Sequence, residues 1–238
     1  MKLNLLLSVI CTGLLFCSSY SVLSQKNIHQ KWDSLLQEYV STTGKVDYQN
    51  WEKDLQGIAS YIEILQENTP TEKWSKDAQL AYWINTYNAV TVQLILDNYP
   101  IKSIQELDSP WDTKLFYTSG IGYTLNEIEH GILRKMDEPR IHFAINCASK
   151  SCPKLQKSAF LSSKLDEQLE KSTYEFLNDS SMNIINKQSI QLSKIFDWFG
   201  EDFGDKTQKI EFVSRYTKVD IDQQAKLTYI PYDWSLNQ

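Results

Sequence analysis

One segment near the middle of the chain limits the possible folds more than any other. From Ser75 to Asn98 the sequence contains no proline or glycine, and Pro100 follows shortly after. Ser75 is a good N-cap residue and proline is common just past a helix end, so the segment predicts one long helix. Its apolar residues are Leu80, Trp83, Ile84, Tyr87, Val90, Leu94 and Ile95. They lie on more than one face, so we expect this helix to be buried at the centre of the fold.

Apolar residues at helical spacing predict further helices along the chain. They are expected at 27–41, 51–65, 125–135, 165–177, 194–202 and 208–217. Thr124 and Glu127 form a capping-box pattern at the start of the 125–135 helix.

Strand signals are few and short. Hairpins are predicted at 115–123 and at 183–192, and the mostly apolar segment 141–146 predicts a strand. The expected fold class is α+β, a helix-dominated single domain with a few short strands and two hairpins.

The N-terminus predicts export. Lys2 precedes an apolar run that ends at Phe16, and small or modest residues lead to Ser24, which is typical of a cleaved signal peptide. We therefore expect a signal peptide at 1–24 and one globular domain at 25–238, periplasmic or extracellular, with lipidation at Cys17 as a second reading. No later segment is apolar enough to predict membrane contact after cleavage.

The charge balance argues against a nucleic-acid partner. The chain has 30 acidic against 24 basic residues, a net charge of −6, and shows no clustered basic stretch. The expected partner is a small molecule or peptide of unknown identity. The sequence predicts no cofactor.

Histidines and cysteines crowd into one short region. This region, residues 130–152, contains His130, His142, Cys147 and Cys152. A cysteine nucleophile is usually activated by a histidine base, so Cys147 with His142 or His130 is the candidate catalytic pair. In a straight strand, however, His142 and Cys147 would point to opposite faces, so the chain must turn near Asn146 for them to meet.

The helix that carries His130 offers a second group. Asn126, His130 and Arg134 are four residues apart and share a face, and Glu127 and Glu129 lie on the same helix. Glu127 could orient a histidine, although its capping-box role is the simpler explanation.

The central helix carries the third group. Asn85 and Asn88 lie on a buried helix, where their amides must be hydrogen-bonded. With Tyr87 they are candidate substrate-binding residues, or the two asparagines tie neighbouring loops to the core.

Six sequence blocks resemble a known family. They are AYWINTYNA, YTLNEIEHGILR, RIHFAINCASKSCPKL, FLND, SKIFDWFGEDF and YIPYDWSLN, which together span about residues 75–237. In their order they are similar to the DUF547 domain family. The resemblance implies a helical α+β domain that occurs in exported bacterial proteins, and it implies no established activity.

Several alternatives stay open for these residues. Cys147 and Cys152 could form a disulfide, which export favours, or Cys147 could be catalytic, or both could join His130 and His142 in a zinc site. His142 could be a core histidine or a base. The segment 232–234 is expected to be a C-terminal lid packed on the core, and His29 is expected at the surface.

Three functions follow from these alternatives. The first is a thiol-dependent hydrolase or acyl transferase acting on amides or peptides, with Cys147 as nucleophile, a histidine as base and Glu127 or Asn88 orienting it. The second is a non-catalytic binding domain with a pocket formed by Trp83, Tyr87, Asn88 and the 147–153 loop. The third is a structural domain. A disulfide between Cys147 and Cys152 would favour the second or third.

Overall fold

The computed structural model describes residues 28–238, so the predicted signal peptide lies outside the described residues. The α-helices are α2 Gln30–Tyr39, α3 Tyr48–Trp51, α4 Leu55–Glu67, α5 Lys76–Asp97, α6 Leu165–Leu177, α7 Ile195–Trp198, α8 Gly200–Phe203 and α9 Lys206–Ser214. Tighter or wider helical turns are η1 Ile104–Glu106, η2 Glu127–Ile132, η3 Leu133–Met136, η4 Pro139–Phe143 and η5 Ser162–Lys164. The strands are β1 Phe116–Thr118, β2 Ile121–Tyr123, β3 Ile184–Ile185, β4 Ser189–Leu192 and β5 Lys226–Tyr229. The prediction of a helix-dominated α+β domain is confirmed.

The long helix α5 is the centre of the molecule, as predicted. The Ser75 side chain caps it by accepting a hydrogen bond from the Ala78 amide, and Asn98 ends it. Most of its side chains are buried, including the polar Asn85 and Thr86. It packs against α4, and η2, η3 and η5 also contact it. Among the described helices none is long and apolar enough to span a membrane.

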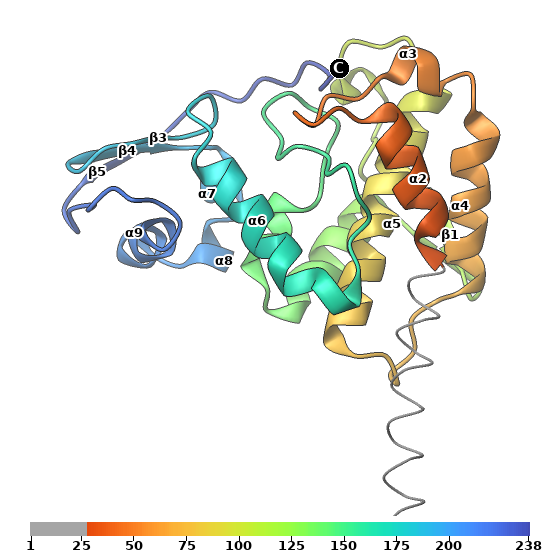
Figure 1. Cartoon of the computed structure of the whole chain (residues 1–238), viewed down its shortest axis with the longest axis horizontal. Coiled ribbons are helices and arrows are strands. Elements are labelled where there is room, and N and C mark those ends of the chain that lie inside the picture. Colours follow the sequence, from red (N-terminus) through yellow and green to blue (C-terminus); the bar gives the residue numbers. More distant parts are fainter. Residues whose placement is uncertain (1–27) are drawn as a thin grey trace, which may run out of the picture.

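Two hydrophobic clusters make up the core. The first surrounds α2, α4 and α5, and the second joins β4 to α7, α8 and α9. Figure 1 shows these groups on opposite sides of the molecule with α6 between them. Leu165 and Leu169 at the start of α6 belong to the first cluster, while Phe176 and Leu177 at its end belong to the second. The helix thus ties both clusters together.

Both predicted hairpins are present. β1 pairs antiparallel with β2, and β3 pairs antiparallel with β4. The sequence did not predict β5, which pairs in parallel with β4 so that Ile190 lies opposite Leu227. After β5 the C-terminal segment 230–238 crosses back to the first cluster, where the Leu236 amide donates to the Lys102 carbonyl.

The predicted strand at 141–146 is wrong. Residues Pro139–Phe143 form the short helix η4, which Glu138 caps by accepting from the Arg140 amide. Ile141 packs in the first cluster and Phe143 in the second, so neighbouring side chains are buried on different sides. An unbroken apolar run is the common signal of a buried strand and of a short buried helix, and burial between two clusters selects the helix.

The 125–135 helix forms with an unexpected geometry. Its capping box is present, because the Glu127 amide donates to Thr124 Oγ1 at 2.9 Å and the Thr124 amide donates to Glu127 Oε2 at 2.8 Å. The following turns widen into the π-helix η2 and then tighten into η3. Such π-turns often occur at functional sites.

His29 is buried, so its expected surface position is wrong. Its Nδ1 lies 2.7 Å from the Tyr61 hydroxyl, and burial lowers the pKa of the imidazole to about 3. This hydrogen bond satisfies a polar ring inside the first cluster.

Candidate functional site

A pocket of about 200 Å³ brings the crowded histidines and cysteines together. Cys147, Cys152, His130 and His142 all line it, with Glu129 and Tyr87 between them. The remaining lining residues are Trp111, Asn126, Ile145, Pro153, Ile195, Trp198, Phe199, Tyr232 and Trp234. The pocket therefore draws on the central helix, on η2 and η4, on α7 and on the C-terminal segment.

The loop that presents Cys147 is tied to the central helix. Asn88 holds it by donating from Nδ2 to the Ala144 carbonyl at 3.0 Å and accepting from the Asn146 amide at 2.8 Å. The Asn146 side chain then accepts from the Ala148 amide at 2.9 Å and donates to the Pro153 carbonyl at 2.7 Å. Ala148 has a φ of 60°, a left-handed turn directly after Cys147. These bonds make the sharp turn that the sequence required near Asn146.

The Cys147 sulfur lies among donors. The Cys147 amide donates to Cys152 Sγ at 3.0 Å, and the sulfur itself lies 3.1 Å from Ser149 Oγ and 3.3 Å from Tyr232 Oη. The Cys152 thiol, and then the Ser149 and Tyr232 hydroxyls, lower the pKa of Cys147 to about 6, although burial opposes them. The partly exposed Cys147 is thus a thiolate near neutral pH, whereas burial keeps the Cys152 pKa high.

The C-terminal segment closes over this loop, as the predicted lid requires. Its backbone pairs with the loop through the Lys150 amide and the Ser235 carbonyl at 2.7 Å. Asp233 accepts from the Ser235 amide, and Trp234 packs on Trp198 with ring centroids 5.6 Å apart. The segment thereby fixes the Tyr232 hydroxyl beside the sulfur.

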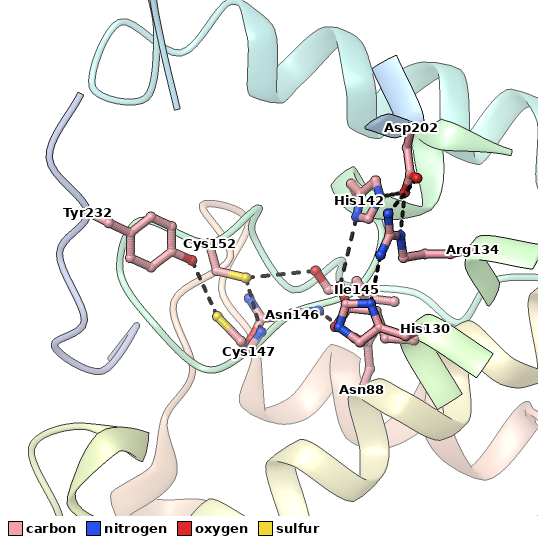
Figure 2. Close-up of polar contacts among 11 residues, drawn as sticks. Asn88, His130, Arg134, His142, Ile145, Asn146, Cys147, Cys152, Asp202 and Tyr232 are labelled. Atoms are coloured by element: carbon pink, nitrogen blue, oxygen red, sulfur yellow. Dashed lines mark hydrogen bonds and ion pairs between the residues drawn. The ribbon is translucent and has the colours of Figure 1, made fainter. Parts of the chain in front are cut away.

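At the other end of the pocket His142 is held by Asp202, which also forms an ion pair with Arg134 (Figure 2). Its Nε2 lies 2.7 Å from Asp202 Oδ2, and Arg134 Nε and Nη2 each donate to Asp202 at 2.6 Å. Hydrogen bonds from His142 and Arg134 lower the Asp202 pKa despite burial, while burial lowers the His142 pKa more than Asp202 raises it. His142 is therefore neutral with Nε2 protonated. Its buried Nδ1 has no hydrogen-bond partner among the described residues.

Glu129 lies between this ion pair and the cysteine. One of its carboxylate oxygens lies 3.9 Å from His142 Nδ1, and the Tyr87 hydroxyl also contacts the carboxylate. Burial, and then the nearby Cys147 charge, raise the Glu129 pKa to about 7. A carboxyl with this pKa can donate and accept protons at neutral pH.

His130 lies at the edge of the pocket, and Glu127 lies outside it. His130 is exposed at the pocket edge, with Nδ1 2.8 Å from Arg134 Nη1. Glu127 points to solvent, lies 3.5 Å from Lys114 Nζ and serves the capping box. The structure thus gives Glu127 the simpler of the two roles that the sequence allowed.

No hydrogen bond within residues 28–238 joins Cys147 to either histidine. Figure 2 shows the Cys147 side chain pointing toward Tyr232, away from the group formed by His142, Arg134 and Asp202. The residues share the pocket, but the direct cysteine–histidine pair that the sequence suggested is not formed. Hydroxyl and thiol donors take the place of the histidine beside the sulfur.

The two asparagines of α5 bind loops. Asn85 donates to the Phe160 carbonyl at 2.8 Å and accepts from the Phe160 amide at 3.0 Å, as Asn88 does for the segment 144–146. The prediction that both are hydrogen-bonded is confirmed. Tyr87 lines the pocket, whereas neither asparagine does.

The structure holds both cysteines as free thiols. Across the described part of the chain, no group of three or more His, Cys, Asp or Glu side chains is arranged to bind a metal ion.

Sequence reasoning missed Asp202 and undervalued Glu129. Asp202 is 60 residues from His142 along the chain, so local spacing could not pair them. Glu129 is the acidic residue of its helix that falls on the inner face, and Ile128 beside it is buried too. The apolar residues around Glu129 were the sequence signal that could have predicted its burial.

These features define a helix-dominated α+β domain with a buried thiol pocket. Residues 71–177 match the family model described as protein of unknown function, DUF547, so this part of the chain belongs to that family. No curated protein and no solved structure matches the chain. The matched segment includes Glu129, His142 and Cys147, whereas Asp202 and Tyr232 lie beyond it.

Proposed function

We propose that the domain is a thiol-dependent hydrolase or acyl transferase that acts on amide or peptide substrates. The observation that carries the proposal is a thiol of lowered pKa, Cys147, in one pocket with a buried carboxyl of raised pKa, Glu129. Titratable groups whose pKa values are shifted in opposite directions, and which share one pocket, are typical of catalytic sites.

The first half of the reaction forms an acyl-enzyme. The Cys147 thiolate attacks the substrate carbonyl carbon, and a sulfur–carbon bond forms. As the carbon–nitrogen bond breaks, the protonated Glu129 carboxyl gives its proton to the leaving amine. The Tyr232 hydroxyl, 3.3 Å from the sulfur, is placed to donate to the carbonyl oxygen as it becomes negative.

The second half releases the acyl group. The Glu129 carboxylate takes a proton from water or from an acceptor amine, which then attacks the thioester carbon. The sulfur–carbon bond breaks, so the Cys147 thiolate and the protonated Glu129 are both restored. His142 is a positioning residue in this scheme, because its free Nδ1 faces the carboxyl and Asp202 fixes the ring.

The alternative is a non-catalytic binding or structural domain with a disulfide between Cys147 and Cys152. Two observations support this alternative: the Cys147 amide lies 3.0 Å from Cys152 Sγ, and an oxidising compartment favours the pairing of nearby cysteines. Both cysteines are free thiols in the structure, so pairing requires the sulfur atoms to move together. For either function we propose export, since residues 1–24 have the pattern of a signal peptide.

Acylation by p-nitrophenyl acetate tests the catalytic proposal. We expect nitrophenol release with an acetyl group on Cys147, found by peptide mass spectrometry, and release from Cys147→Ser no faster than the background hydrolysis of the ester. Glu129→Gln should slow the deacylation step roughly 100-fold, the usual effect of losing a general base. Glu127→Gln, on the same helix but exposed, is the matched control.

The catalytic proposal fails if Cys147 in the reduced native protein is acylated no faster than in the urea-unfolded chain. A Cys147–Cys152 disulfide in protein isolated from the periplasm without reductant would favour the non-catalytic alternative.

A further inference from the structure

The pocket has an aromatic wall of which the acyl-transfer steps use only the Tyr232 hydroxyl. The wall consists of Trp111, Trp198, Tyr232 and Trp234. Trp234 lies at its centre, with ring centroids 5.7 Å from Trp111, 5.6 Å from Trp198 and 4.6 Å from Tyr232. The rings come from three distant parts of the chain, so the fold gathers them at one edge of the pocket.

The wall is fixed in place, and its Trp198 ring is open to solvent. The Asn126 amide donates to the Trp111 carbonyl at 3.0 Å, and the Asp233 amide donates to Ser151 Oγ at 2.9 Å. Trp198 is nevertheless 47 % exposed, although it packs on two other rings. A large exposed aromatic surface at the rim of a pocket is typical of a binding site.

The charges around the pocket favour a cation. Among the described residues that line it there is no lysine or arginine. His130 and His142 have lowered pKa values, so they are neutral at pH 7. The Cys147 thiolate supplies negative charge, Glu129 adds to it when it is ionised, and aromatic faces attract cations.

The side chains in and beside the wall further restrict the chemical class of ligand that can bind there. Apart from Asn126 and the Tyr232 hydroxyl, the side chains that line the pocket next to the wall offer few hydrogen-bond groups for hydroxyls. Arg134 lies behind His130 and Phe199 and is paired with Asp202, so the lining itself presents only neutral or negative groups to an anion. An apolar cation can contact the rings and keep a favourable charge.

We propose that the aromatic wall binds an alkylammonium group. The acyl compounds processed at Cys147 then carry such a group next to the scissile bond. This second half rests on the proposed function, whereas the binding of the cation does not.

Choline and 3,3-dimethylbutan-1-ol test the binding, because they have the same shape and differ in charge. Titration calorimetry on the reduced chain should show choline bound roughly tenfold more tightly than the alcohol. Trp198→Leu should remove that difference, and Tyr174→Leu, an equally exposed aromatic on α6 outside the pocket, should keep it. Equal binding of the two compounds to the wild-type chain would overturn the inference.

Acetylcholine and 3,3-dimethylbutyl acetate separate this inference from the proposed function. We expect acetylcholine to acetylate Cys147 roughly tenfold faster. If both esters react equally and choline has no advantage in binding, the inference fails while the thiol chemistry stands. If choline is preferred but neither ester acetylates Cys147, the thiol chemistry fails while the cation site stands.

Discussion

At the scale of single residues, the reactivity of Cys147 depends on Cys152, Ser149 and Tyr232. We expect its alkylation by iodoacetamide to rise with pH through a midpoint near 6, because the thiolate is the reactive form and the pKa of Cys147 is lowered to about 6. Tyr232→Phe removes one donor and should move the midpoint to higher pH.

The matched control for this experiment is Tyr174→Phe, which removes an exposed hydroxyl from a residue that does not line the pocket. A wild-type midpoint near the ~8.5 of an ordinary cysteine would show that the donors do not stabilise the thiolate.

Glu129 gives a pH dependence of stability with a definite sign. Its folded-state pKa is raised from 4.5 to about 7, so the folded protein holds this proton more strongly than the unfolded chain. The contribution to the free energy of unfolding is therefore present below pH 4.5 and is lost as the pH rises through 7, by roughly 3 kcal/mol. Urea unfolding of Glu129→Gln at pH 5 and pH 8 should lack this loss.

Glu127→Gln is the control for that measurement. Glu127 is exposed on the same helix and its pKa is lowered, so its contribution is lost below 4.5 and is flat between pH 5 and 8. If wild type and Glu129→Gln respond equally to pH, Glu129 is not the titrating group.

At the scale of elements, α5 supports two loops through chemically similar amides. Asn88→Ala and Asn85→Ala each leave a buried backbone amide and carbonyl unpaired, so each should lower the free energy of unfolding by about 1–3 kcal/mol. Asn88 holds the Cys147 loop and Asn85 holds Phe160. We expect Asn88→Ala also to shift the pH profile of Cys147 alkylation, and Asn85→Ala to leave it unchanged.

The same element shows how far sequence reasoning reaches. Helix α5, its Ser75 cap and the bonded state of its two asparagines were predictable, because caps, periodicity and buried amides are local signals. Helix η4 and strand β5 were not, because their conformation depends on what packs around them. The cysteines and histidines of the site were visible as a cluster in the sequence. Their partners Asp202 and Tyr232 come from segments that only the tertiary fold brings near.

At the scale of the whole molecule, the pocket joins the two hydrophobic clusters. Glu129 and Cys147 adjoin residues of the first cluster, whereas His142 stacks on Phe199 beside the second, with ring centroids 4.2 Å apart. Helices α6 and η4 contribute to both clusters. Unfolding of either cluster would therefore disrupt the pocket.

We therefore expect the clusters to unfold as one cooperative unit. Ile58→Ala in the first cluster and Ile190→Ala in the second each remove a fully buried side chain, which should cost about 2–5 kcal/mol. Unfolding is followed by far-ultraviolet circular dichroism and by the reaction of Cys152 with a thiol reagent. In both variants the two signals should change at the same urea midpoint, and this midpoint should be lower than in the wild type. Cys152 is suited to this measurement because it is buried where the pocket, the loop and the C-terminal segment meet. If Ile190→Ala exposed Cys152 at a urea concentration where the circular dichroism of the helices was unchanged, the second cluster would be a separate unit.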